Sequence, residues 1–230
     1  MKIKVFIVAA AMLFAAAAYG QTGYQQPSKA IMDVLNAPET PLASVSPTGR
    51  TIALYEPLRY PPISELAEPM LRLAGLRIDP NVNSRHRQPY YVSLQFMPVS
   101  GGSAKKVALP NGIRIVSPRW SADGRYLAFG NITAAGVELW IADTTAATAR
   151  KIDGVRVNTV LGGFDWMPDQ RTLLVNTVSA ERGEAPAYRD LTPLGPSIQE
   201  TSGRSGAVAT YQDLLKTPND EKLFEYYATS

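Results

Sequence analysis

The sequence predicts an all-β protein, specifically a partial β-propeller of about three blades with short helical insertions. Three segments that align without gaps carry this prediction: Val45–Leu54, Trp120–Phe129 and Trp166–Val175. Each contains an apolar residue, a tight turn that ends in arginine, and an apolar strand, in that order. The 46 residues from Arg125 to Arg171 suit one four-stranded blade of about 40 to 50 residues. An ordinary β-sandwich with similar turns is the alternative architecture.

The repeated unit has the composition of a β-hairpin. Asp123-Gly124 and Thr48-Gly49 place a glycine where a tight turn requires a positive φ. After the second turn, strands are expected over 126–131, 137–143 and 149–152, because these stretches are apolar or alternate between apolar and polar residues. The first and second repeats are 75 residues apart, from Arg50 to Arg125. The first blade is therefore expected to contain an insertion of about 30 residues.

Two helical segments are expected before the second repeat. Ser28 is placed to cap a short helix whose apolar residues Ile31, Val34 and Leu35 share one face, and Pro38 ends it. The stretch 61–75 predicts one or two helical turns inside an insertion near 57–90.

The C-terminal part of the sequence is less periodic. Residues near 180–209 are rich in proline, glycine and serine and predict a flexible loop. A helical turn is expected over 211–216 and the start of a strand over 223–228.

The N-terminus has the layout of a secretory signal peptide over residues 1–20. Lys2 and Lys4 precede an uncharged apolar run of fourteen residues, shorter than the roughly twenty needed to span a bilayer. Small residues at Ala18 and Gly20 predict cleavage before Gln21, which leaves an incomplete propeller domain over 21–230. The chain has no cysteine for a lipid anchor or disulfide. We therefore expect a periplasmic or secreted protein that has no membrane association after signal cleavage.

Composition and motifs supply no catalytic, cofactor-binding or metal-binding residue. The basic residues are scattered and the net charge is only +3, so no nucleic-acid partner is predicted. A serine triad needs a histidine, and the one histidine, His86, lies between two arginines that disfavour its protonated form. No G-x-S-x-G nucleophile motif, phosphate-binding glycine loop, zinc spacing or calcium loop is present.

Several motifs in this order resemble the N-terminal half of the glutamyl endopeptidase branch of the prolyl oligopeptidase family. They are Arg59-Tyr-Pro-Pro-Ile-Ser-Glu-Leu-Ala-Glu-Pro69, Leu73-Ala-Gly-Leu-Arg-Ile-Asp79, Asn83-Ser-Arg-His-Arg87, Gly163-Phe-Asp-Trp166 and Thr210-Tyr-Gln-Asp-Leu-Leu-Lys216. The resemblance implies an N-terminal propeller that caps a C-terminal α/β-hydrolase domain carrying the serine, aspartate and histidine. It further implies a fragment of a secreted serine peptidase that restricts the access of peptide substrates to a catalytic domain absent from this chain.

One group of residues is a candidate binding site. Arg77, Arg85 and Arg87 follow the insertion, and guanidinium groups bind carboxylates through paired hydrogen bonds. We predict that they contact an acidic substrate or another domain, and salt bridges to Asp79 or Glu65 are the structural alternative. The alternative function is a stand-alone propeller-like scaffold of the cell envelope that binds peptides or a protein.

Overall fold

A computed structural model describes residues 26–187, 203 and 213–230. The expected signal peptide, its cleavage site and most of the loop near 180–209 lie outside these residues. The chain divides into two compact units, 1–38 and 39–230. Within the first, helix α2 spans Lys29–Leu35 directly after Ser28, whose side chain makes no capping hydrogen bond. No helix in the described ranges is long and apolar enough to cross a membrane.

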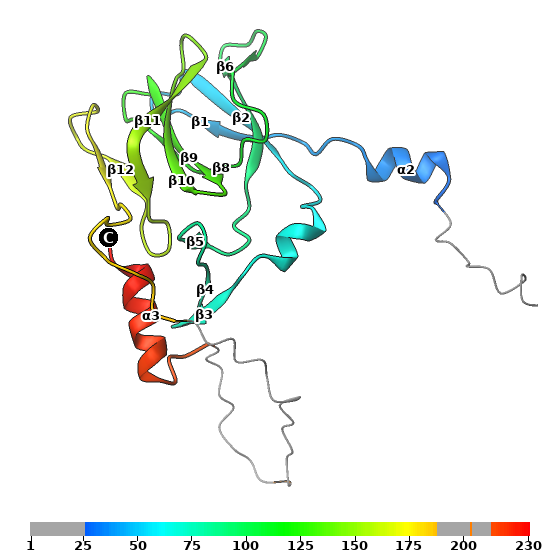
Figure 1. Cartoon of the computed structure of the whole chain (residues 1–230). Coiled ribbons are helices and arrows are strands. Elements are labelled where there is room, and N and C mark those ends of the chain that lie inside the picture. The colour runs from blue at the N-terminus through cyan, green and yellow to red at the C-terminus, as the bar shows by residue number, and fades with distance from the viewer. Residues whose placement is uncertain (1–25, 188–202, 204–212) are drawn as a thin grey trace, which may run out of the picture. The chain divides into compact units, whose positions relative to one another are not determined.

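The second unit consists mostly of antiparallel strands (Figure 1). Its first strands are β1 (Leu42–Val45), β2 (Thr51–Pro57), β3 (Leu71–Leu73), β4 (Leu76–Asp79), β5 (Ser84–Arg85), β6 (Tyr91–Pro98) and β7 (Lys105–Lys106). The remaining strands are β8 (Ile115–Trp120), β9 (Tyr126–Thr133), β10 (Gly136–Asp143), β11 (Thr148–Val157), β12 (Phe164–Trp166) and β13 (Leu173–Val175). The predicted all-β class is confirmed.

The strands form successive antiparallel meanders. β1, β2, β6 and β7 make one four-stranded unit, and β8 to β11 make a second. Between these two units, β6 and β8 pair at one residue position, Tyr91 with Ile115, and an isolated bridge joins Ala108 to Thr148. β12 and β13 form a separate hairpin. Two four-stranded units and the first hairpin of a third, with no sheet closed on itself among the described residues, confirm a partial propeller.

The three sequence repeats coincide with the first hairpin of each unit. Their paired residues are equivalent: Val45 with Ile52, Trp120 with Leu127, and Trp166 with Leu173. Each turn also has the same two backbone hydrogen bonds. In the second, Ser121 N donates to Tyr126 O at 2.9 Å and Gly124 N donates to Ser121 O at 2.9 Å. The third turn uses Gln170 at φ 60° where the first two use glycine.

Aspartates shape two of the turns. Asp123 Oδ1 accepts from the Ser121 hydroxyl, and Asp169 accepts from the Thr172 hydroxyl and from two backbone amides. These hydrogen bonds hold the pKa of both carboxyls below its usual value. The bonds from the Ser121 and Thr172 hydroxyls make the largest contribution. The two aspartates therefore stabilise the turns in which they lie.

Tryptophans at the repeat position connect each unit to the one before it. Trp120 Nε1 donates to Ser44 Oγ on β1 at 2.9 Å, and Trp166 Nε1 donates to Arg119 O on β8 at 3.0 Å. Ser44 immediately precedes Val45, which is the equivalent of Trp120 in the first repeat. Arg119 likewise immediately precedes Trp120, which is the equivalent of Trp166 in the second repeat. The recurring tryptophans thus act between units.

The middle hairpin is buried more completely than its equivalents. Leu127 and Phe129 are fully buried, whereas the equivalent residues of the first and third hairpins are only half-buried. One core joins the first and second units and contains Leu94, Phe96, Ile115, Leu127 and Phe129. A second core lies between the second unit and the third hairpin. Burial on both sides is the packing expected for the inner member of a row of blades.

The insertion in the first unit contains less helix than predicted. A 3₁₀ helix, η1, covers only Ile63–Ala67, and the small sheet β3–β4–β5 follows it. Leu71, Leu73 and Ile78 are buried on this sheet. The prediction of helical turns over 61–75 was therefore wrong for its second half, where apolar residues alternate with exposed ones.

The predicted strand over 223–228 is also wrong, because helix α3 spans Pro218–Ala228. Thr217 and Asp220 form a capping box and Pro218 occupies the first turn, which together favour a helix start. Leu223 and Tyr227 are one helical turn apart and are its buried residues. They share a third core with Leu71, Leu73 and Ile78, so α3 packs on the small sheet. The described residues 213–216 are not helical, and the rest of the turn expected over 211–216 lies outside the described residues.

The stacking of the repeated turns is testable at two equivalent glycines. A Cβ atom added at Gly124 would lie 2.9 Å from Thr48 Oγ1 and 3.2 Å from Ser46 Cβ of the preceding turn. At Gly49, with nearly the same φ, it would meet nothing within 4 Å. Both alanine substitutions carry a left-handed strain of about 1–2 kcal/mol.

We expect Gly124→Ala to lower the free energy of unfolding by about 1 kcal/mol more than Gly49→Ala, because it also crowds the neighbouring turn. Urea unfolding of the two variants and the unsubstituted chain measures this difference. Equal losses would show that the turns do not press on one another.

Candidate functional site

Two of the three predicted arginines line a common pocket of about 380 Å³. We call this the Arg85 pocket. Its polar lining residues are Arg85, His86, Arg87, Gln88, Ser117 and Thr159. They come from the end of the first insertion, from β8 and from the connection between β11 and β12. The pocket therefore depends on the packing of three segments that are distant in sequence.

Hydrogen bonds fix the walls of this pocket. Arg85 Nε donates to Val160 O at 3.4 Å, which ties the insertion to the connection after β11. Gln88 Nε2 donates to Ser117 Oγ at 3.2 Å across to β8. Ser117 lies in the irregular part of β8, between Val116 and Arg119, with φ 50°. Arg87 has φ 54°, so two non-glycine residues of the rim have left-handed backbone.

The charge of the pocket is unbalanced. No aspartate or glutamate is among its lining residues. Within the described ranges, neither Arg85 nor Arg87 forms a salt bridge. Thr159 is buried, and its hydroxyl has no hydrogen-bond partner among the described residues. The arrangement can thus accept an anion without first breaking an ion pair.

Arg77 does not belong to this pocket. It lies on β4 opposite Arg72 of β3, and its Nε is 3.9 Å from Asp213 Oδ2. Arg85 pairs with Ile78, the residue after Arg77, so the two arginines occupy opposite faces of the small sheet. The sequence grouped all three because they are close along the chain, whereas strand alternation separates one of them.

The alternative salt bridges do not form in the described structure. Asp79 instead accepts from the backbone amide of Asn81 at 2.9 Å. Glu65 accepts from the hydroxyl of Tyr90 at 2.7 Å and lies 3.8 Å from Arg114. Burial, followed by this hydrogen bond to Glu65, raises the pKa of Tyr90 to about 12. Both acids therefore stabilise the insertion and leave the arginines of the pocket unpaired.

His86 has a structural environment. Its backbone amide donates to Arg77 O, and its ring Nε2 lies 3.2 Å from the carbonyl oxygen of Glu68. The Ser117 hydroxyl is engaged by Gln88, as described above. Among the described residues, no group of three or more histidines and carboxylates is arranged to hold a metal ion. The arrangement is suited to binding, and no nucleophile–base pair is seen in it.

Residues that were not predicted as site residues connect the segments of the pocket to helix α3. Asn158, directly before Thr159, donates from Nδ2 to the carbonyls of Tyr227 and Thr229, each at 3.0 Å. The buried Asn83 donates to the same Tyr227 carbonyl at 3.1 Å. Arg182 donates to Asn83 Oδ1 at 2.5 Å and lies over the Tyr226 ring at 4.2 Å. Helix α3 thereby anchors both the insertion and the connection that build the site.

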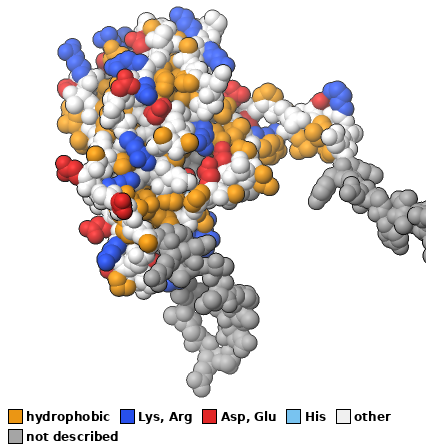
Figure 2. All heavy atoms as spheres, in the orientation of Figure 1, with side chains coloured by type: hydrophobic (Ala, Val, Ile, Leu, Met, Phe, Trp, Pro, Cys, Tyr) orange, Lys and Arg blue, Asp and Glu red, His pale blue; other side chains and the backbone are white. Residues whose placement is uncertain are grey.

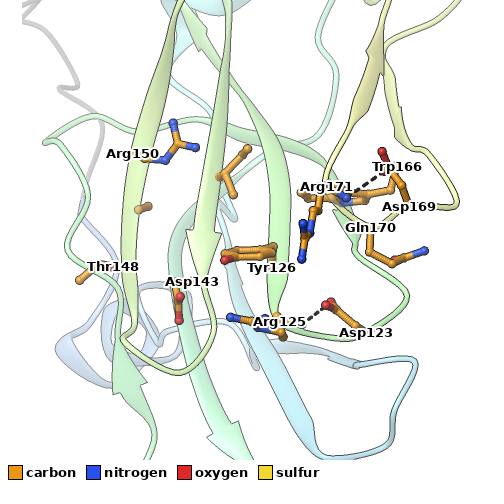
Figure 3. Close-up of a pocket in the computed structure, with 12 residues that line it drawn as sticks. Asp123, Arg125, Tyr126, Asp143, Thr148, Arg150, Trp166, Asp169, Gln170 and Arg171 are labelled. Carbon is orange, nitrogen blue, oxygen red and sulfur yellow. Dashed lines mark hydrogen bonds between the residues drawn. The ribbon is translucent and has the colours of Figure 1, made fainter.

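A second cavity, of about 860 Å³, lies between β9, β10 and β11 and the third hairpin (Figure 3). The Arg125 guanidinium lies 5.6 Å from the centre of the Tyr126 ring, and Figure 3 shows Arg171 on the third hairpin and Arg150 on β11. Three aspartates also line this cavity and balance its three arginines: Asp123, Asp143 and Asp169. The cavity adjoins β12 and the turn before β13, and β13 pairs only with β12 in the described structure. Because of its position and its balanced charge, we interpret this cavity as a gap between the second unit and the third hairpin. In the described structure, the third unit consists only of β12 and β13.

Basic side chains elsewhere are not concentrated. Figure 2 shows lysines and arginines dispersed over the visible face, with acidic residues between them. No large basic patch is seen on this face. The Arg85 pocket is therefore distinguished by local geometry and not by a large charged patch.

Comparison with known proteins relates the chain to peptidases. No family model matches it. It is 38% identical over 223 residues to a probable chloroplastic glutamyl endopeptidase of Oryza sativa subsp. japonica, covering 90% of this chain and 24% of that protein. A probable chloroplastic glutamyl endopeptidase of Arabidopsis thaliana is 36% identical over 223 residues, covering 91% of this chain and 23% of that protein. The chain thus spans about a quarter of the length of these curated relatives.

Solved structures give weaker likenesses. The β-propeller domain of the Trilobed protease from Pyrococcus furiosus has a TM-score of 0.34 at 17% identity, covering 60% of this chain and 34% of that one. An acylaminoacyl peptidase of Pyrococcus horikoshii has a TM-score of 0.35 at 16% identity, covering 66% of this chain and 19% of that one. Because these scores are low, the assignment depends on the two curated relatives and on the repeated hairpins. The similarity of nine-tenths of this chain to two proteins named glutamyl endopeptidase, together with its repeated hairpins, supports its assignment as a propeller part of such a protein in the prolyl oligopeptidase family.

Proposed function

We propose that this chain is the N-terminal propeller portion of a secreted serine endopeptidase resembling glutamyl endopeptidase. In that protein it restricts the access of substrates to a catalytic α/β-hydrolase domain that these 230 residues do not contain. The observation that carries the proposal is the 38% identity over 90% of the chain to a probable glutamyl endopeptidase about four times as long.

The packing of the blades supports a role in restricting access. The units are joined by side-chain hydrogen bonds such as Trp120 to Ser44, and by a buried hydrophobic core between the first and second units. Blades connected in this way move little against one another, so an opening that they surround has a fixed width. An extended peptide passes such an opening, and a folded protein does not.

Export from the cytoplasm is a further part of the proposal. Its support is the charged and apolar composition of residues 1–20 together with the absence of cysteine. The two curated relatives are named chloroplastic, and chloroplast import uses an N-terminal targeting segment of a different composition. We propose a periplasmic or secreted location for this chain.

The purified 230-residue chain should not hydrolyse glutamate-containing peptides, because its one histidine is engaged with a backbone carbonyl and no serine nucleophile motif is present. Peptide turnover followed by mass spectrometry measures this. His86→Ala is the control, and both proteins should remain at the buffer background. Turnover that His86→Ala abolishes would contradict the assignment of catalysis to another domain.

The access role is testable in the complete gene product. Trp120→Ala removes both the indole that contacts Phe96 and its hydrogen bond to Ser44, and should loosen the first unit against the second. We expect cleavage of a folded protein substrate to rise severalfold relative to cleavage of a short peptide. Trp120→Phe keeps most of the packing and should change this ratio less.

Two results would overturn the proposal. If Trp120→Ala melts at a lower temperature than Trp120→Phe and still leaves the cleavage ratio unchanged, the propeller does not restrict access. If the complete gene product carries no serine nucleophile and cleaves nothing, the chain is a binding scaffold instead.

A further inference from the structure

We propose that Asn111 is a site of non-enzymatic modification, at which the side-chain amide is replaced by a carboxylate through a cyclic imide formed with the backbone nitrogen of Gly112. The only co-reactant is water. The inference goes beyond the proposed function and does not depend on it. It rests on the sequence, the exposure and the hydrogen bonding of one turn between β7 and β8.

The reaction has two steps that balance. In the first, the Gly112 nitrogen attacks the side-chain carbonyl carbon of Asn111, so a nitrogen–carbon bond forms. The bond from that carbon to the side-chain nitrogen breaks, and the proton lost by Gly112 leaves with this nitrogen as ammonia. In the second step, water adds to either carbonyl carbon of the five-membered imide. Opening on one side gives aspartate, and opening on the other gives isoaspartate, whose main chain contains one more carbon atom.

The sequence distinguishes this position from the other asparagines. Asn111 is the one asparagine of the 230 residues that is followed by glycine. Glycine has no Cβ atom, so its nitrogen approaches the preceding side chain without steric hindrance and its backbone adopts the torsion angles that the ring requires. The residues that follow Asn131, Asn158 and Asn176 are β-branched and hinder this approach.

The structure leaves both reacting groups of the turn without hydrogen-bond partners. Asn111 and Gly112 are exposed and lie between the buried residues Val107 and Ile113. Gly112 has φ 73°, and a Cβ atom added to it would meet nothing within 4 Å. Within the described ranges, neither the side-chain amide of Asn111 nor the backbone amide of Gly112 forms a hydrogen bond. The two groups can therefore react without first breaking other contacts.

Asn83 has the opposite surroundings and provides a control within the same chain. It precedes Ser84, which is not branched at Cβ and hinders the ring little. Asn83 is fully buried, its Nδ2 donates to Tyr227 O at 3.1 Å, and its Oδ1 accepts from Arg182. Because both ends of this amide are held, Asn83 reacts only after local opening of the structure around it.

The electrostatic surroundings favour the charged product. Asn111 lines a cavity of about 570 Å³ whose charged lining residues are Arg114, Lys151 and Glu138. It also lines a smaller cavity of about 200 Å³, where Lys106 is the one charged residue in the described lining. Cationic side chains therefore outnumber carboxylates around the turn. They stabilise the Gly112 nitrogen as it loses its proton and the carboxylate that forms later.

The turn lies where the first unit meets the second. Ala108 forms a bridge to Thr148 of β11, and the backbone amide of Arg114 donates to Asn131 Oδ1 on β9 at 3.0 Å. Both ends of the loop are thus attached to the second unit. The modification adds a negative charge to this loop and, as isoaspartate, one more backbone carbon atom between the two attachments.

The test incubates the purified 230-residue chain in mildly alkaline buffer made with water enriched in heavy oxygen. Peptide mapping by mass spectrometry follows the label at each asparagine and separates isoaspartate from aspartate. We expect conversion of Asn111 to be at least about tenfold faster than that of Asn83, which reacts only from locally opened states. The rate at Asn111 should rise with pH, because the attacking nitrogen must lose a proton, and both isomers should form.

Two variants assign the conversion to the ring. Gly112→Ala adds a Cβ atom to the attacking residue and should slow conversion at Asn111 severalfold, with no change at Asn83. Asn111→Gln would have to form a larger ring and should show no conversion at this position over the same period. Circular dichroism checks the folding of Gly112→Ala, because Gly112 has a left-handed φ. Asn111→Gln changes an exposed side chain that has no described hydrogen bond, and it decides if the alanine variant does not fold.

Incubation in urea separates the contribution of structure from that of sequence. In the unfolded chain the rate at Asn83 should rise severalfold or more, because its amide is released. The rate at Asn111 should change little, because this residue is exposed in the folded chain already.

Four results would overturn the proposal. Conversion of Asn111 no faster than that of Asn83 in the folded chain would show that the turn does not favour the reaction. Aspartate as the sole product would indicate direct hydrolysis without the ring. An unchanged rate in a folded Gly112→Ala variant, or conversion of Asn111→Gln at the original rate, would reject Gly112 as the attacking residue. None of these measurements involves peptide hydrolysis, so this inference and the proposed function can fail separately.

Discussion

The contact between each repeated hairpin and the hairpin before it is the interaction on which the rest of the structure depends. Trp120 and Trp166 each donate an indole hydrogen bond one unit back, to Ser44 and to the carbonyl of Arg119. The side chain of Gln170 continues the contact by accepting from the backbone amide of Ala122. One short pattern, repeated in sequence, therefore sets both the shape of each hairpin and its position relative to the next.

This row of hairpins determines where insertions can be placed and hence where a site can form. In the second unit, β9 and β10 are joined by a tight turn, whereas in the first unit the equivalent strands β2 and β6 are separated by residues 58–90. That insertion folds as a small sheet and shares a core with α3. Its last residues then return along β8 and form the Arg85 pocket. The pocket exists because a long insertion is anchored at both ends to a rigid row of blades.

Sequence reasoning succeeded where structure is local and repeated. The hairpins were predicted in their correct positions because glycine or aspartate turns followed by apolar strands recur in register. Helix α3 was not predicted, although the capping box formed by Thr217 and Asp220 marks its start. The aromatic residues that follow are typical of a strand as well. Of the candidate site, Arg85 and Arg87 were predicted, but Thr159 and Ser117 were not. No sequence pattern marks these two, because only the packing of distant segments brings them to the arginines.

The most direct test of this account is amide hydrogen exchange measured by NMR on the 230-residue chain at the three equivalent turn positions, Gly49, Gly124 and Gln170. Their amides make the same backbone hydrogen bond, at 2.8, 2.9 and 3.0 Å, so local geometry alone predicts similar protection. Because only the middle turn has a neighbouring turn on each side in the described structure, we predict a protection factor at Gly124 at least about tenfold above the other two. Equal protection at all three would contradict the claim that each hairpin is held in place by its neighbours.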